Sequence, residues 1–164
     1  MCVSRHRGTV TRMEFLKSFD DEHREIFLSA ADTLVLERGE YLMRRGEPGG
    51  DVFMLKEGTL EIVDTRSSPE VILAILSDGT MVGEMAFVDS SPRSADVRAG
   101  ATTEVLRWAR DDLRILLKRR PELAATFYET VAKVASSRIR RLTEGAVSGT
   151  YTKGEGLNQA GLAR

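Results

Sequence analysis

The segment between Val82 and Val97 carries the side chains best suited to chemistry, and it reads V-G-E-M-A-F-V-D-S-S-P-R-S-A-D-V. Its Gly-Glu pair predicts the start of a single helical turn, and a Pro-Arg-Ser-Ala stretch follows further on. The segment thus brings one carboxylate, one guanidinium and a helix N-terminus within reach of one small pocket. A carboxylate suits ribose hydroxyls, a guanidinium suits a phosphate, and free N–H groups at a helix start suit an anion. The spacing predicts a site for a phosphorylated, sugar-containing small molecule.

Each of these residues also has a purely structural interpretation. Gly83 can close a turn, Glu84 can be a first-turn acid favoured by the helix dipole, and Arg93 can be a solvated charge after a loop. However, the small residues Gly83, Ala86 and Ala95 flank the two charged ones, as close approach of a ligand to the backbone requires. Taken together, the residues favour a binding site over three separate structural roles.

The composition is that of a soluble globular domain: 164 residues, 41% hydrophobic and 30% charged. The net charge of −1 gives no global field that would recruit nucleic acid or an anionic membrane. Cys2 is the only cysteine, which excludes a disulfide framework and a thiolate metal cluster within one chain. The N-terminus lacks the apolar stretch of a signal peptide, and the longest apolar runs, such as Val71 to Leu76, are too short to span a bilayer. We therefore expect a cytoplasmic protein with no membrane contact.

Two short helices are expected before the first strand, with Asp20 as the N-cap of the second. Strand-like pieces separated by turn glycines follow, at about 33–37, 40–44, 52–56, 59–64, 70–76, 94–99 and 103–108. Glu57-Gly58 and Asp78-Gly79 resemble hairpin turns. This spacing, without intervening long helices, favours a sandwich, roll or barrel over a parallel α/β sheet.

The pattern becomes helical again after Trp108. A helix is expected to start at Asp111, and a longer one to run from Pro121 to about Thr143, with Gly145 ending it. The predicted fold is therefore mainly β: a β-roll or jelly roll, preceded by short N-terminal helices and followed by two C-terminal helices. The predicted division is a loose N-terminus at 1–11, a binding domain at 12–144 and a disordered tail at 145–164.

The sequence G-E-M-A-F followed by P-R-S-A resembles the phosphate-binding cassette of cyclic nucleotide-binding domains. That family includes the catabolite activator proteins, the kinase A regulatory subunits and cyclic nucleotide-gated channels. The upstream stretch R-G-E-P-G-G-D-V-F-M-L-K-E-G-T-L-E-I is similar to the glycine-turn signature of the family. The resemblance covers roughly Phe15 to Leu142.

The resemblance implies a role for each residue of the cassette. Glu84 would hydrogen-bond the ribose 2′-hydroxyl, and Arg93 would pair with the cyclic phosphate. Backbone N–H groups near Met85 and Ala86 would also face the phosphate. The Ser94 hydroxyl would reach the phosphate or a syn guanine. The remaining ligand-binding positions are the flanking small residues, Gly83 and Ala95.

The purine is less well specified by the sequence. In the family, a residue of the long C-terminal helix often covers the base, and Arg138 lies on the right part of that helix to stack on it. The alternative is that Arg138 and its neighbours are solvated polar positions. We favour cyclic AMP over cyclic GMP as the ligand, while the Ser94 hydroxyl keeps cyclic GMP as an alternative.

In the family, ligand binding closes the C-terminal helices over the roll, and an effector senses that movement. Only about twenty residues follow Thr143, too few for a helix-turn-helix domain. We therefore expect a stand-alone receptor acting on a separate protein, or an excised regulatory domain. The apolar stripe of the long helix suits a homodimer, or packing on the roll. Its basic cluster is interpreted as solvated, so no direct nucleic-acid binding is expected.

An enzyme is the main rival interpretation, because jelly rolls also house metal-dependent oxygenases. The two histidines, His6 and His23, both precede the first predicted strand, so a two-histidine metal site in the roll is excluded by count. No nucleophile set is convincing either. We expect no catalytic residues, no metal and no cofactor besides the nucleotide ligand. Two alternatives stay open: the sensing fragment of a larger transcription regulator, or a drifted structural domain that no longer binds nucleotide.

Overall fold

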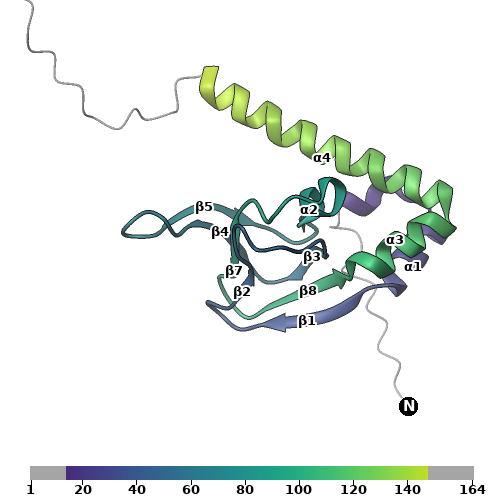
Figure 1. Ribbon diagram of the computed structural model, residues 1–164, viewed down its shortest axis with the longest axis horizontal. Coiled ribbons are helices and arrows are strands. Elements are labelled where there is room, and N and C mark those ends of the chain that lie inside the picture. Colours follow the sequence, from purple (N-terminus) through teal and green to yellow (C-terminus); the bar gives the residue numbers. More distant parts are fainter. Residues whose placement is uncertain (1–13, 148–164) are drawn as a thin grey trace, which may run out of the picture. The chain divides into compact units, whose positions relative to one another are not determined.

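The computed structural model describes residues 14–147, which form eight strands, four α-helices and one 3₁₀ helix. The helices before the sheets are η2 (Glu14–Ser18) and α1 (Asp21–Ser29). The strands are β1 (Asp32–Leu36), β2 (Tyr41–Met43), β3 (Val52–Glu57), β4 (Leu60–Asp64), β5 (Val71–Leu76), β6 (Met81–Val82), β7 (Asp96–Ala99) and β8 (Thr103–Trp108). Helix α2 (Glu84–Asp89) separates β6 from β7, while α3 (Arg110–Arg119) and α4 (Pro121–Val147) follow β8 (Figure 1).

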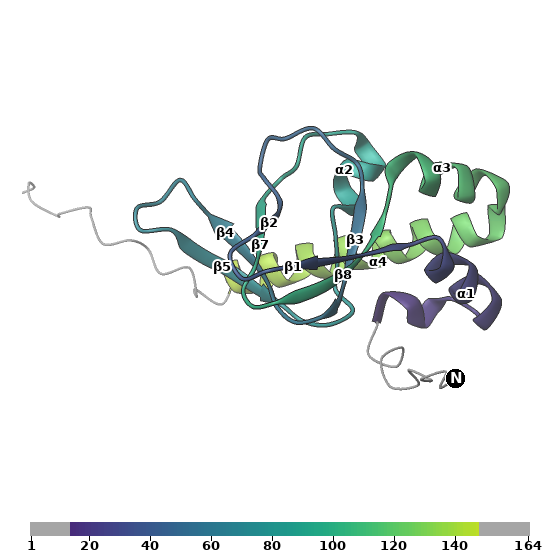
Figure 2. The ribbon, with the colours of Figure 1, turned by 90° about the horizontal axis from the view of Figure 1, so that it is seen from below.

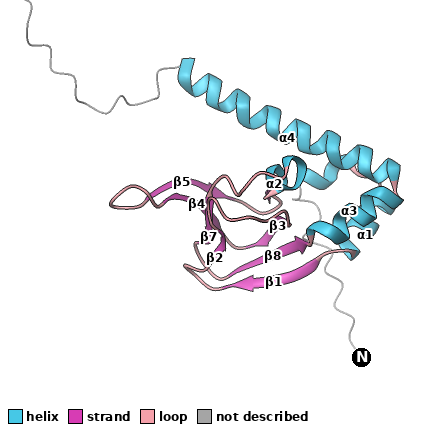
Figure 3. Cartoon of the chain, viewed as in Figure 1, coloured by secondary structure: helices cyan, strands magenta, loops and turns pink. Residues whose placement is uncertain are grey.

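The strands form two four-stranded antiparallel sheets, ordered β1-β8-β3-β6 and β2-β7-β4-β5. Figure 3 shows the strands in magenta and the helices in cyan. This is the strand order of a jelly roll, in which two sheets enclose one core. The core between them consists of seven buried apolar side chains: Met43, Phe53, Leu55, Leu60, Val82, Val97 and Val105. The predicted fold class, a mainly β roll with flanking helices, is confirmed.

The glycine turns do not form the hairpins that the sequence indicated. Strands β3 and β4 belong to different sheets, and so do β5 and β6, so the chain changes sheet at Gly58 and again at Gly79. Both glycines have positive φ, 111° and 82°, a conformation that side chains disfavour. The consecutive strands that do pair are β4 and β5, whose connecting loop at 65–70 contains no glycine. Gly58 and Gly79 therefore lie where the chain passes from one sheet to the other.

Several predicted boundaries agree with the structure. The Asp20 side chain caps α1 by accepting from the His23 N–H at 2.7 Å, and Pro121 is the first residue of α4. The two-residue strand β6 is too short for a sequence pattern to indicate.

At its C-terminal end, helix α4 does not stop at Gly145 but continues to Val147, because a glycine costs a helix only about 1 kcal/mol relative to alanine. The expectations for residues 1–11 and for most of the 145–164 tail lie outside the described residues.

A second core, made of aromatic rings, joins the helices to the end of the roll. The Phe27 and Trp108 rings are stacked 4.4 Å apart, and the Trp108 indole N–H donates to the Phe27 carbonyl at 2.8 Å. Phe127 of α4 contacts Phe27 and Phe87, with ring centroids 5.8 and 5.7 Å away. In both views α1 and α3 lie together at one end of the roll, opposite the β4–β5 loop (Figures 1 and 2). These aromatic rings connect α2 to the first turns of α4.

The chain divides into two compact units, Met1–Thr130 and Val131–Arg164, and the boundary falls within α4. The first unit contains both sheets and the aromatic core. Among the helices of the described part, none is long and apolar enough to cross a membrane.

We expect Phe127→Ala to lower the free energy of unfolding by about 3–5 kcal/mol, because it leaves a cavity beneath three other rings. The measurement is urea unfolding, monitored by the fluorescence of Trp108, the only tryptophan in the sequence. The matched control is Ile115→Ala on the exposed face of α3, for which a change below about 0.5 kcal/mol is expected. Equal losses in the two variants would contradict the assignment of Phe127 to the core.

Candidate functional site

Arg93 lies in the loop between α2 and β7, and its backbone ties that loop to the loop between β2 and β3. Its N–H donates to the Glu47 carbonyl at 2.9 Å, and its carbonyl accepts from the Gly46 N–H at 2.8 Å. The strand expected at about 94–99 is present, but it begins two residues later, at Asp96. These two hydrogen bonds, rather than a sheet, hold Arg93 in place.

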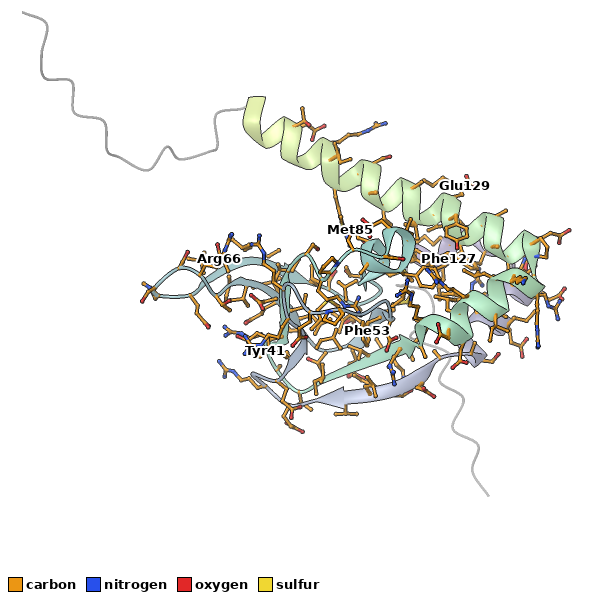
Figure 4. All side chains as sticks on the ribbon, in the orientation of Figure 1. Tyr41, Phe53, Arg66, Met85, Phe127 and Glu129 are labelled. Atoms are coloured by element: carbon orange, nitrogen blue, oxygen red, sulfur yellow. The ribbon has the colours of Figure 1, made fainter. Side chains whose placement is uncertain are left out.

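The Arg93 guanidinium is buried in a space formed by two glycines. Its Nη1 donates to the Gly83 carbonyl at 3.2 Å. A Cβ atom on Gly83 would lie only 2.6 Å from that Nη1, and one on Gly49 would lie 3.2 Å from Nη2. On a further side, the guanidinium carbon is 5.7 Å from the centre of the Phe53 ring, which lies inside the roll (Figure 4). Any side chain at Gly83 would displace the guanidinium.

Three carboxylates offset the cost of burying this charge. Burial, which leaves 7% of Arg93 exposed, lowers the pKa of its guanidinium, while Asp51, Glu47 and Glu84 raise that pKa. Because an arginine starts from a pKa far above neutrality, the group keeps its charge. The site therefore presents a permanent buried cation, which is suited to an anionic ligand.

Glu84 is the first residue of α2 and is only 3% exposed. It follows Gly83, whose left-handed backbone (φ 85°) forms the N-cap of the helix without a side-chain bond. A carboxylate in the first helical turn is stabilised by the helix dipole. The first backbone bond from the helix to this cap is made by the Phe87 N–H, which donates to the Gly83 carbonyl at 3.3 Å. The N–H groups of Met85 and Ala86 thus lie in the turn where helix donors have no intrahelical acceptor.

The structure brings Gly83, Glu84 and Arg93 together, as the sequence predicted. Ala86 is buried beside them, whereas Met85, which Figure 4 labels on α2, is 53% exposed. In the stretch before β7, Ser94 is exposed and Ala95 is half-buried.

Arg138 belongs to the second unit of the chain, so its place over a purine stays a prediction.

Sequence reasoning missed Asp51, which organises the surroundings of Arg93. Its carboxylate accepts from the Arg107 side chain at 2.7 and 2.8 Å, and from the Arg110 N–H at 3.0 Å at the start of α3. Its charge also acts on Arg93. The available signal is the Gly49-Gly50-Asp51 run directly before a buried strand, whose two glycines by themselves indicate only a turn. The contacts of Asp51 depend on β8 and α3, which are distant in sequence.

Within residues 14–147, no group of three His, Cys, Asp or Glu side chains is placed to hold a metal ion. The described site offers a carboxylate, a guanidinium and backbone N–H groups. Such a set can bind a polar anion.

Comparisons with known proteins point to one family. A family model described as "Cyclic nucleotide-binding domain" matches residues 33–120. The chain is 31% identical over 112 residues to a cAMP-dependent protein kinase regulatory subunit of Emericella nidulans, covering 68% of this chain and 27% of that protein. It is 30% identical over 102 residues to human cGMP-dependent protein kinase 2, covering 62% of this chain and 13% of the kinase.

A solved structure with the same fold is the N-terminal domain of a transcriptional regulator from Streptomyces coelicolor. It has a TM-score of 0.66 and 26% identity, and the match covers 83% of this chain and 95% of that one. The chain spans about a quarter or less of the two curated kinase relatives.

We expect Gly83→Ala to destabilise the fold more than Gly39→Ala, a matched control. Both glycines have positive φ, 85° and 89°, so each substitution costs about 1–2 kcal/mol of backbone strain. A Cβ atom at Gly39 meets nothing within 4 Å, whereas at Gly83 it also meets the Asp51 carbonyl at 2.7 Å. Overpacking should therefore add about 1–3 kcal/mol at Gly83 alone, measured by urea unfolding. Equal losses would show that the space around Arg93 is not tight.

Proposed function

This chain belongs to the cyclic nucleotide-binding domain family, a regulatory and not a catalytic one, and we propose that Glu84 and Arg93 are the residues that hold its nucleotide. The observation that carries the proposal is the burial of both charged side chains beside the same glycine, Gly83. Arg93 pairs with the cyclic phosphate, and Glu84 accepts from the ribose 2′-hydroxyl. We propose that the chain is a sensor that acts in the cytoplasm and has no catalytic function of its own.

The geometry of the guanidinium supports this role for Arg93. The bond to Gly83 uses one of its five N–H donors, so a fork of donors remains for phosphate oxygens. The N–H groups of Met85 and Ala86, at the start of α2, lie next to Glu84 and add uncharged donors for the phosphate. Ser94 and Ala95 follow Arg93 directly, where a small side chain leaves room for the ligand.

We take cyclic AMP as the preferred nucleotide and cyclic GMP as the alternative. A stacking contact from Arg138 on α4 would hold the purine without any hydroxyl that recognises guanine. We therefore place cyclic AMP first. The exposed Ser94 hydroxyl supports the alternative. The two curated relatives are named for cAMP in one case and for cGMP in the other, so both nucleotides belong in the test.

We expect the wild-type chain to bind at least one of the two nucleotides with micromolar or better affinity in a calorimetric titration. Arg93→Ala should weaken that affinity by more than about a hundredfold, because it leaves a buried phosphate without its counter-charge. Arg98→Ala on β7 is the matched control, since Arg98 is paired with Glu61 and Glu70, and binding should be unchanged.

The role of Glu84 has its own control within this titration. Glu84→Gln should weaken the binding of cyclic AMP. It should not further weaken the binding of the 2′-deoxy analogue, which lacks the hydroxyl that donates to Glu84. If neither nucleotide binds the folded wild-type chain, the proposal is refuted, and the drifted structural domain becomes the better interpretation.

The output of the sensor is proposed to pass through α2. This helix carries Glu84 at the nucleotide and, one turn later, Phe87, which packs edge-on against Phe127 of α4 at 5.7 Å and 82°. A shift of α2 on binding must therefore change the packing of the first turns of α4. The partner that senses α4 is a separate protein effector, and a homodimer through α4 is a further proposal.

We expect Phe87→Leu to keep nucleotide affinity within about tenfold, because the core swap is modest and lies away from the ligand. It should abolish the ligand-induced change in hydrogen exchange at residues 121–130, because the ring contact with Phe127 is lost. Val88→Leu, on the exposed face of the same helix, should keep both properties. If Phe87→Leu keeps the ligand-induced change in hydrogen exchange at residues 121–130, transmission through the contact between Phe87 and Phe127 is excluded.

A second candidate is the sensing part of a larger transcription regulator. The match to the Streptomyces coelicolor regulator domain favours it, because it covers 95% of that chain. Coding sequence for a DNA-binding domain downstream of Arg164 would support this candidate, and a stop codon there would exclude it.

A further inference from the structure

Ser90 ends helix α2 in a backbone conformation that side chains disfavour. Its φ is 60° and its ψ is 18°, and among residues 14–147 it is the one residue other than glycine with a positive φ. Glycine adopts this left-handed region without penalty, whereas other residues do not. The contacts of the Ser90 side chain show what the hydroxyl does at this position.

Two arginines of α3 point at the Ser90 hydroxyl. Its Oγ accepts from the Arg110 Nη2 at 2.7 Å and lies 3.5 Å from the Arg114 Nη2. The two arginines are four residues apart and so lie on the same face of α3. Ser90 itself is exposed, as are Ser91 and Pro92 after it. An accessible hydroxyl thus lies between two guanidinium groups.

The Arg110 guanidinium has a donor that this hydroxyl does not use. Its Nε is buried and has no hydrogen-bond partner, a condition shared by no other buried side-chain nitrogen or oxygen in the described residues. Nε and Nη2 form one fork of two parallel N–H donors, and a single hydroxyl oxygen occupies only the Nη2 half. The Arg110 side chain packs closely against Gly50, where a Cβ atom would lie 2.5 Å from the Arg110 Cδ. This packing limits the rotation of the fork. A group with two oxygens would satisfy both donors.

We propose that Ser90 is a phosphorylation site, and that Arg110 and Arg114 hold the phosphoserine against the first turns of α3. A separate protein kinase forms the bond from Oγ to the γ-phosphorus of a nucleoside triphosphate. The bond from that phosphorus to the bridging oxygen breaks, the nucleoside diphosphate leaves, and the hydroxyl proton is released. Two phosphate oxygens then accept from the Arg110 fork, and a third faces Arg114.

The neighbouring acids do not compete for this fork. The Asp89 side chain accepts from the Ser91 N–H at 2.9 Å, and Asp51 binds the Arg110 backbone rather than its guanidinium. A free anion would have to displace the Ser90 hydroxyl, whereas a phosphate on that oxygen is held there covalently. The modification would fasten the loop that leads to Arg93 onto α3. This inference does not depend on nucleotide binding.

The test compares the chain carrying phosphoserine at position 90 with the chain carrying it at position 91, both made by genetic incorporation. Phosphorus NMR should find the second pKa of phosphoserine 90 about one pH unit below that of phosphoserine 91. The thermal midpoint should rise on modification at 90 and not at 91. Arg110→Lys keeps the charge but removes the fork, and should cancel most of the rise in midpoint.

Three results would overturn the proposal. The first is identical titration and stability of the two phosphoserine proteins. The second is stabilisation of unmodified wild type and Ser90→Ala by inorganic phosphate in an Arg110-dependent manner, which would assign the fork to a free anion. The third is phosphopeptide mapping of the chain from its native cells that finds phosphate only on other serines, or none.

Discussion

A buried guanidinium makes two demands on a fold, and the Arg93 surroundings meet both. The group needs space, which Gly49 and Gly83 provide by having no side chains where Cβ atoms would contact it. It also needs counter-charge, which Glu47 and Asp51 provide from the β2–β3 loop and Glu84 provides from the start of α2. The loops that carry these residues are joined by the backbone bonds between Arg93 and the segment at Gly46 and Glu47. The β-roll brings these loops together at one place.

Helix α2 is short, yet its residues and its C-cap contact three different neighbours. Its first residue, Glu84, lies at the guanidinium site, its middle residue Phe87 packs against Phe127, and the serine at its end meets the arginines of α3. A six-residue helix gains little stability from its own hydrogen bonds, so these contacts fix its position. Any movement of α2 therefore changes the contacts of Glu84, Phe87 and Ser90 together.

The sequence predicted the parts of the site that charge and spacing reveal. Glu84 and Arg93 are recognisable because two charged residues stand among small ones in a helix-and-loop segment. Asp51 is not, because its partners Arg107 and Arg110 come from β8 and α3. For the fold, glycines showed where the chain turns, but Gly58 alone cannot show that the next strand joins the other sheet, since that depends on pairing with β7. The end of α4 was misplaced because one glycine is a weak stop signal.

The jelly-roll strand order also has a consequence for how the chain is made. In its sheet, β1 pairs with β8, and β3 pairs with β8 and β6, so the first strand stays without its neighbour until Trp108 has been synthesised. Pairings that join such distant segments slow folding, because the entropy of closing a long loop is lost before any contact forms. The ribosome releases β1 long before β8. During synthesis, β1 and β3 therefore stay without the strand that lies between them in the finished sheet.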